Sequence, residues 1–199
     1  MIGNRRASYT MVGIPDGLGA YDNADGAPGN GQLGVSRLWA ITFNNVNDLA
    51  KAVASGNISD VGTIQLLIDG APVNMMDNMG INAQGVVSLD EDTGKAAHNP
   101  KTWQYNTKNG DLTQIFESDP NLFGNLTPWN QYTPPTAPFN ADKEPSGALD
   151  VTDLFKDASW RKPGTEVILA DYQAHMNYPS DSPLVEGGQL DLLIRRPGR

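Results

Sequence analysis

Paired acidic side chains are the residues of this chain best suited to chemistry. Glu91 and Asp92 follow the apolar run Val86–Leu89, and Asp77 stands beside Asn78 in a second β-prone run. Calcium takes roughly six to eight oxygen ligands, and neighbouring carboxylates are a ready source of them. One interpretation is a metal site that uses Glu91, Asp92 and Asp77. The alternative is solvated acidic turns and backbone caps.

Arg37 is the basic residue most suited to a substrate phosphate, because the guanidinium fork matches phosphate oxygens. Its alternative role is a plain surface charge. His98 and His175 are the only histidines of the chain. Either could ligate a metal or transfer a proton, and core or turn roles are the alternative for both.

The composition excludes several classes of function. Fourteen Lys and Arg face 23 Asp and Glu, a net charge of −9, so we expect no nucleic-acid partner. The absence of Cys excludes a disulfide, a zinc–thiolate site and a cysteine nucleophile. No apolar run is long enough to span a membrane, and no apolar segment follows Arg5 and Arg6, so we expect no membrane span and see no signal peptide.

Short strands are the expected elements, because 21 Gly and 14 Pro supply many turns. Apolar residues at spacings of three and four predict a short helix near 45–55, and 150–155 favours a helical turn. Residues 126–142 are typical of an irregular loop. The expected strands cover residues 8–14, 35–43, 63–68 (closed by Asp69 and Gly70), 73–81, 86–89, 101–105, 112–117, 166–171 and 188–195.

The four strands between residues 73 and 117 predict one antiparallel β-meander, which is the plan of a propeller blade. Asn109-Gly110 favours a type I′ hairpin turn between the last two strands. The predicted fold is all-β, a partial or small β-propeller in one domain over 1–199. It comprises an N-terminal motif at 8–21, a loop at 22–34 and late blades at 35–195. Unpaired strand edges in such a partial ring predict self-association.

Several motifs occur in an order that resembles one known family. They are the run from Met11 to Tyr21, Arg37-Leu38-Trp39 with Thr63–Gly70, Asn74–Asn82 with Asp90-Glu91-Asp92 and Ala96-Ala97-His98-Asn99, Glu144-Pro145-Ser146-Gly147, and Gln173-Ala174-His175. Together they cover nearly the whole chain from residue 8 to residue 195. The chain resembles the PhoX-type alkaline phosphatases, a secreted family of calcium-dependent β-propellers.

The resemblance implies calcium-dependent hydrolysis of phosphomonoesters and an extracellular or periplasmic location. It adds Glu144 to the metal ligands Glu91, Asp92 and Asp77. The chain departs from the family in being about half its length, and it lacks the Cys of the family's iron site, so we expect no iron. Lys143 beside Glu144 is expected to weaken cation binding. We therefore expect weak or absent hydrolysis; the alternative is a non-catalytic, calcium-binding or self-associating β module.

Overall fold

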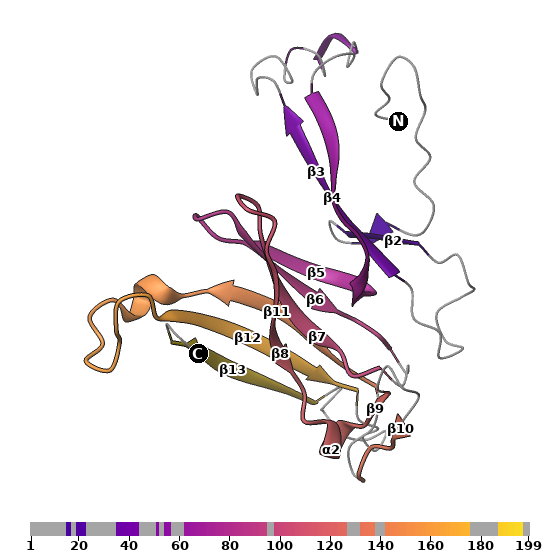
Figure 1. Cartoon of the computed structure of the whole chain (residues 1–199), viewed down its shortest axis with the longest axis vertical. Coiled ribbons are helices and arrows are strands. Elements are labelled where there is room, and N and C mark those ends of the chain that lie inside the picture. Colours follow the sequence, from indigo (N-terminus) through magenta and orange to yellow (C-terminus); the bar gives the residue numbers. More distant parts are fainter. Residues whose placement is uncertain are drawn as a thin grey trace.

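Antiparallel β-strands dominate the computed structural model of the chain, so the all-β prediction is confirmed (Figure 1). The described strands form separate sheets, and these do not close into a barrel or a ring of blades. The structure describes residues 15–16, 19–22, 35–43, 51, 54–56, 62–94, 98–126, 132–137, 142–175 and 187–196. The predicted strand at 8–14 lies outside these residues.

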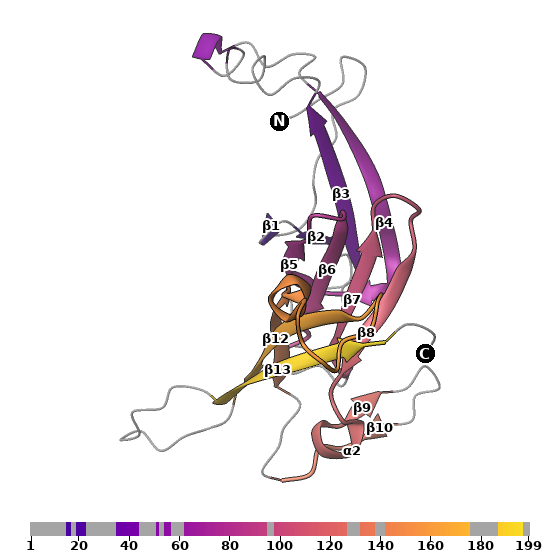
Figure 2. The same cartoon turned by 90° about the vertical axis from the view of Figure 1, so that its left-hand side faces the viewer.

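The first sheet has the strand order β1-β2-β3-β4. Its strands are β1 (Pro15–Asp16), β2 (Gly19–Asp22), β3 (Val35–Phe43) and β4 (Gly62–Asn74). β3 and β4 project away from the other sheets as a long two-stranded arm (Figure 2). The expected end of β4 at Asp69 and Gly70 is wrong. Gly70 takes a positive φ of 81°, at an irregularity in the pairing of β3 with β4. The strand continues beyond it to Asn74.

The second sheet is the predicted meander, because its four strands pair in sequence order. They are β5 (Met76–Ile81), β6 (Val86–Glu91), β7 (Lys101–Asn106) and β8 (Leu112–Glu117). The expected single strand over 73–81 is instead divided at Met75, where the chain turns from the first sheet into the second.

The turn between β7 and β8 is not type I′, which requires a positive φ at both central residues. Among the described residues other than glycine, only Met75 has a positive φ, so Asn109 does not. The turn is longer and is closed by two backbone hydrogen bonds. Asn106 N donates to Asp111 O at 2.9 Å, and Gly110 N donates to Asn106 O at 2.8 Å. Gly110 alone takes the left-handed conformation.

The third sheet has the order β11-β12-β13, formed by β11 (Lys143–Asp150), β12 (Glu166–Ala174) and β13 (Gly187–Arg195). Strands near 166–171 and 188–195 were expected, whereas β11 was not. The helical turn expected at 150–155 is the 3₁₀ helix η1 (Thr152–Phe155). Short elements precede the sheet: α2 (Pro120–Phe123), β9 (Asn125–Leu126) and β10 (Tyr132–Thr133).

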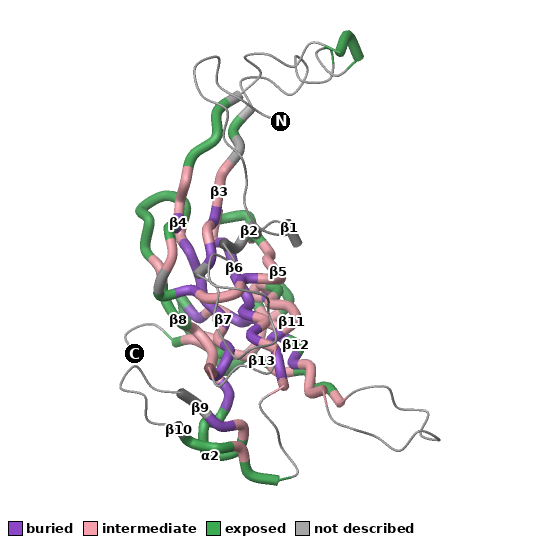
Figure 3. The backbone as a smooth tube through the Cα atoms, turned by 90° about the vertical axis from the view of Figure 1, so that its right-hand side faces the viewer, coloured by how far each residue is buried: buried purple, intermediate pink, exposed green. Residues whose placement is uncertain are grey.

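The meander lies between the first and third sheets, and its two faces differ in chemistry. Toward the first sheet it packs an apolar cluster that includes Leu38, Val73, Leu89 and Trp103. Fully burying one such aliphatic side chain contributes about 1.5–3 kcal/mol. Toward the third sheet the meander makes polar contacts, for example Gln104 Nε2 to Glu166 Oε1 at 2.6 Å, and an edge-to-face contact between Phe116 and Tyr172. Figure 3 shows the buried residues gathered where the sheets meet, with the far ends of β3 and β4 exposed.

The helix expected near 45–55 is helical at its described residues Lys51, Ala54 and Ser55. Gly56 follows with a positive φ of 69°, as a residue that ends a helix often does. No helix in the described part of the chain is long and apolar enough to cross a lipid bilayer.

Candidate metal centre

Asp77 on β5, Asp92 directly after β6 and Glu144 on β11 come together between two sheets. One carboxylate oxygen of each lies within 4.8 Å of those of the other two. Asp77 and Asp92 are half-buried, and Glu144 is only 8% exposed. A set of three carboxylates this close offers three to six oxygens to one cation.

An irregularity in β5 positions Asp77. Met76 pairs with Glu91 and Met79 with Leu89, so Asp77 and Asn78 both stand opposite the single residue Asp90. This is a β-bulge, a feature that turns side chains out of the regular strand alternation and is common beside functional sites. Asn78 Nδ2 donates to Asp77 Oδ2 at 3.0 Å and holds the carboxylate from within the bulge.

A left-handed corner at Met75, with φ of 43°, fixes Asp92 beside this bulge. The Asp92 backbone N–H donates to Met75 O at 2.9 Å. On either side of Met75, Asn74 N donates to Glu91 Oε1 at 2.9 Å and Met76 N to Ser36 Oγ at 2.7 Å. A non-glycine residue in this region costs about 1–3 kcal/mol, so the surrounding hydrogen bonds must hold it there.

Glu144 is positioned by a second bulge, at Ser146 between Pro145 and Gly147 of β11. Ser146 Oγ lies 3.1 Å from Glu144 Oε1 and 3.2 Å from Gln173 Oε1, and its one hydroxyl proton can serve either. The bulge therefore aims Glu144 across the gap between the sheets and brings two further oxygen atoms next to it.

Lys143 does not oppose the cluster in the way that the sequence suggested. Adjacent residues on a strand face opposite ways, and Lys143 is buried, with Nζ donating to Phe123 O at 3.1 Å and lying 5.7 Å from the centre of the Phe123 ring. Burial lowers the pKa of Lys143 to about 8. The Phe123 carbonyl and ring stabilise the ammonium.

The cluster carries more negative charge than its surroundings balance. Burial, followed by the neighbouring Asp92 carboxyl, raises the pKa of Glu144 to about 7, against a smaller lowering by Ser146 and His175. Burial also raises the pKa of Asp90 to about 7; a hydrogen bond from Thr102 opposes this, and the charges of Asp171 and Asp77 add to it. A bound cation would reverse both shifts.

Asp90 is a part of this acidic region that the sequence analysis did not single out. Its side chain is fully buried, and Thr102 Oγ1 donates to its Oδ1 at 2.7 Å. Its Oδ2 is buried without a hydrogen-bond partner among the described residues. The strand alternation could have revealed it, because Asp90 and Asp92 share one face of β6 while Glu91 faces the other way.

Glu91 does not join the cluster, although the sequence analysis placed it there. Its carboxylate is fully buried on the opposite face of β6 and accepts four hydrogen bonds. Oε1 accepts from Asn74 N and Trp103 Nε1, both at 2.9 Å. Oε2 accepts from Lys101 N at 3.0 Å and contacts His98 Nε2 at 2.8 Å. Through these contacts Glu91, at the end of β6, links β6 to β4 and β7.

The remaining predicted site residues are distributed over the molecule. Arg37 lies on β3, and its Nε donates to Asp69 Oδ1 at 2.8 Å. His98 is the partner of Glu91. His175 directly follows β12 and lies close enough to Glu144 to lower the pKa of that carboxyl. The structure thus brings Asp77, Asp92 and Glu144 together and leaves Glu91 and Arg37 outside the group.

The fold and the site define an all-β protein of antiparallel sheets with a carboxylate cluster between two of them. No family model, curated protein or solved structure matches the chain. The chemistry of the cluster must therefore be argued from its own geometry. Its donors are all oxygens, which suits a hard cation such as calcium and not a metal that requires thiolate or imidazole.

Proposed function

We propose that the chain is a calcium-binding β-sheet protein with the plan of a partial PhoX-type propeller, in which the ion joins the second and third sheets. The observation that carries this proposal is the approach of Asp77, Asp92 and Glu144 to within 4.8 Å of one another. Their surroundings add a second argument, because buried like charges are costly unless a cation balances them.

Calcium is favoured over magnesium by the character of the site. Calcium accepts irregular sets of roughly six to eight oxygens at about 2.3–2.6 Å, whereas magnesium requires a nearly regular octahedron. Here the carboxylates come from two bulges and a strand end, and the Ser146 hydroxyl and Gln173 carbonyl lie beside Glu144. Such a mixed and uneven set fits the larger ion.

Phosphomonoester hydrolysis by this chain is weak or absent under the proposal. A bound metal can activate water for attack on phosphorus, but the charge that develops must also be stabilised. The Nε of Arg37 is bound to Asp69 on the first sheet, and the chain has no Cys to bind iron. A calcium ion alone then acts mainly as a structural link.

The test combines calcium binding with an activity assay. Calcium is titrated calorimetrically into wild-type protein and into the variants Asp92→Asn and Glu144→Gln, with Asp157→Asn at an exposed position as the matched control. We expect binding by the wild type and the control, and loss of at least tenfold in affinity in the other two. Unchanged affinity in all variants overturns the site. Robust calcium-dependent hydrolysis of p-nitrophenyl phosphate overturns the non-catalytic assignment.

A second function, self-association, is favoured by an apolar surface on the third sheet. Glu166 and Tyr172 of β12 lie an even number of residues apart and both turn toward the meander. The odd-numbered residues of β12, and the residues paired with them, therefore face away. This outer face carries Leu149, Leu190, Leu192 and Ile194, which are 62%, 71%, 49% and 45% exposed. Contiguous apolar patches of this kind mark interaction surfaces.

A second copy of the chain is the partner that we propose for this surface. β13 lies at the edge of its sheet among the described strands. In an antiparallel pair of two β13 strands centred on Leu193, Leu192 of one copy stands opposite Ile194 of the other. The same register places Asp191 opposite Arg195, which pairs opposite charges across the interface.

A further inference from the structure

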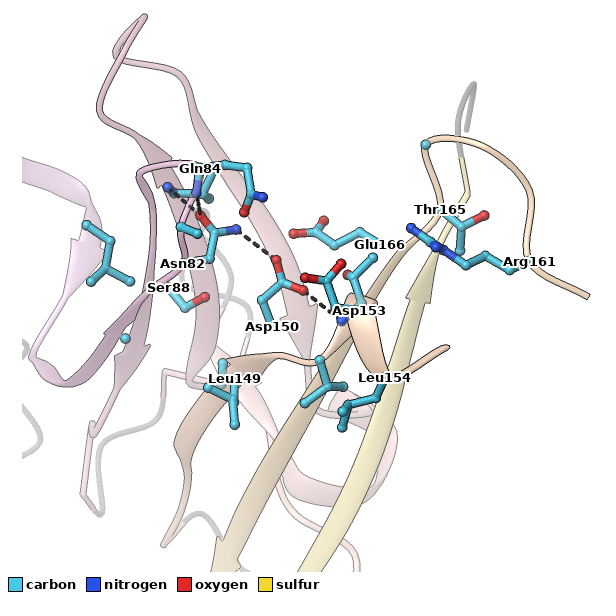
Figure 4. Close-up of a pocket in the computed structure, with 18 residues that line it drawn as sticks. Asn82, Gln84, Ser88, Leu149, Asp150, Asp153, Leu154, Arg161, Thr165 and Glu166 are labelled. Carbon is cyan, nitrogen blue, oxygen red and sulfur yellow. Dashed lines mark hydrogen bonds between the residues drawn. The ribbon is translucent and has the colours of Figure 1, made fainter. Parts of the chain in front are cut away.

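A pocket of about 790 Å³ lies between the meander and the third sheet, at the end where η1 begins. Its walls come from the β5–β6 turn, from the end of β11 and η1, and from the loop before β12 (Figure 4). Asp77, Asp92 and Glu144 are not among its lining residues, so it is separate from the metal cluster. Small-molecule sites have volumes of roughly 300–1,000 Å³, a range that includes this pocket.

Two of the acidic residues in the pocket already accept hydrogen bonds from other residues of the protein. Asp150 accepts hydrogen bonds from Asn82 Nδ2 at 2.8 Å and from Thr152 N at 2.9 Å. Burial opposes ionisation of Asp150, but these hydrogen bonds outweigh it and hold its pKa below the ordinary value. Glu166 accepts from Gln104 Nε2 at 2.6 Å and from Arg195 Nη1 at 2.8 Å.

Arg161 and Asp153 differ from these two acids. Arg161 Nε is buried, and its guanidinium makes no hydrogen bond or ion pair within the described part of the chain. Figure 4 shows the guanidinium extending from its loop toward the interior of the pocket. The Asp153 carboxylate also lines the pocket and accepts no hydrogen bond from a described residue. A buried donor without a partner is costly, so a ligand group that accepts a hydrogen bond from it would gain free energy here.

The remaining wall is apolar and exposed. Ile81 and Leu154 line the pocket and are 66% and 81% exposed. In Figure 4 the side chain of Leu154 lies below the acidic residues. A ligand with an apolar part would cover this surface and gain the hydrophobic free energy of its burial.

We propose that this pocket binds a small zwitterion, an α-amino acid with an apolar side chain. Its carboxylate would bind the Arg161 guanidinium, its ammonium group would bind the Asp153 carboxylate, and its side chain would cover Ile81 and Leu154. The three carboxylates of the pocket disfavour a ligand of high negative charge, such as phosphate, because like charges repel. A zwitterion matches one unpaired cation and one unpaired anion without adding net charge.

Nuclear magnetic resonance titration of the full chain with L-leucine tests the proposal. We expect shifts of backbone amide signals around η1 and residues 161–166 that saturate at millimolar ligand. Loss of the ligand's ammonium group, in 4-methylpentanoate, or of its carboxylate, in 3-methylbutylamine, should weaken binding by about tenfold or more, equivalent to about 1.4 kcal/mol. Titrations with and without calcium should agree, because the metal cluster is separate.

The variants Arg161→Gln and Asp153→Asn should each weaken L-leucine binding about tenfold, while Lys162→Gln, an exposed neighbour outside the pocket, leaves it unchanged. Thermal melts confirm that each variant is folded; neither substitution removes a protein hydrogen bond, so we expect unchanged melting temperatures. Failure of L-leucine to shift these signals, or equal binding by all variants, overturns the proposal. Tighter binding of inorganic phosphate that depends on Arg161 would overturn the zwitterion in favour of a plain anion site.

Discussion

Three consecutive acids in the chain, Asp90, Glu91 and Asp92, have three different environments. Strand alternation turns Asp90 and Asp92 toward the third sheet and Glu91 toward the apolar core side. Asp92 meets two other carboxylates, Asp90 is buried with one unpartnered oxygen, and Glu91 is saturated by four hydrogen-bond contacts. A run of identical charge therefore contains both the candidate ligand and a structural residue.

Substitution of Glu91 tests this division at the residue scale. Glu91→Ala leaves Trp103 Nε1 and two backbone N–H groups buried without acceptors, so we expect a loss of about 3–5 kcal/mol in the free energy of unfolding. Urea unfolding measures it. The milder Glu91→Gln should remain folded and bind calcium with wild-type affinity within about threefold. A tenfold loss of calcium affinity in folded Glu91→Gln would instead identify Glu91 as a ligand.

The pH dependence of the metal-free protein follows from the raised pKa values of Glu144 and Asp90, both about 7. Between about pH 4.5 and pH 7 the folded protein holds protons that the unfolded chain releases, so the free energy of unfolding falls as pH rises through this window. We expect a fall on the order of 2 kcal/mol in urea titrations with EDTA.

Calcium should reverse this trend, because it competes with the proton for Glu144. Calcium affinity is expected to rise from pH 5 to pH 7 and to level off above that. The variant Glu144→Gln should lose part of the pH dependence in EDTA. A metal-free stability that rises steadily between pH 5 and pH 7 contradicts the raised pKa values.

At the scale of elements, the corner at Met75 connects two sheets and holds Asp92 through its carbonyl. A β-branched residue is disfavoured at positive φ, so Met75→Ile should cost about 1–2 kcal/mol in stability and weaken calcium binding. Met79→Ile is the matched control, because Met79 pairs regularly with Leu89 in β5, where a β-branched residue is favoured. Equal effects of the two substitutions would show that the corner does not determine the site.

Short-range patterns allowed much of the fold to be predicted. Alternation and turn residues predicted the four-stranded meander, which begins at Met76 and ends at Glu117, and the strand near 188–195. β11 was missed because its sequence includes Pro145, Ser146 and Gly147, which are rare in strands, and because pairing with β12 overrides that local preference.

The candidate site could be predicted only in part. Asp77 and Asp92 were recognised as acids of suitable type, and Glu144 only through a family resemblance. Their convergence depends on two bulges and on the packing of the third sheet on the meander, and no local pattern encodes these contacts. The same limit explains Glu91: its neighbours Asn74 and Trp103 lie 17 and 12 residues away in the chain.

At the scale of the whole molecule, several contacts between the meander and the third sheet are hydrogen bonds between side chains, which are specific links. A calcium ion held by residues of both sheets would be another such link. Binding to the folded state alone stabilises a protein by about 2.7 kcal/mol at a ligand concentration of 100 times Kd. Saturating calcium should therefore raise the melting temperature of the wild type by several degrees and leave Glu144→Gln unaffected.

Self-association is also a property of the whole molecule. We expect sedimentation velocity at micromolar concentration to show a dimer for the wild type and a monomer for Leu192→Lys, because a charge on the outer face would be buried without a partner. Leu122→Lys, on α2 and 37% exposed, is the control and should remain dimeric. A monomeric wild type excludes the outer face as a contact between copies.

A crystal structure determined in the presence of calcium tests the central claim most directly. The account predicts an ion about 2.3–2.6 Å from carboxylate oxygens of Asp77, Asp92 and Glu144, with Glu91 still bound to Trp103 and outside the coordination sphere. Density without an ion between these three carboxylates at saturating calcium, or calcium bound only elsewhere on the chain, would contradict it.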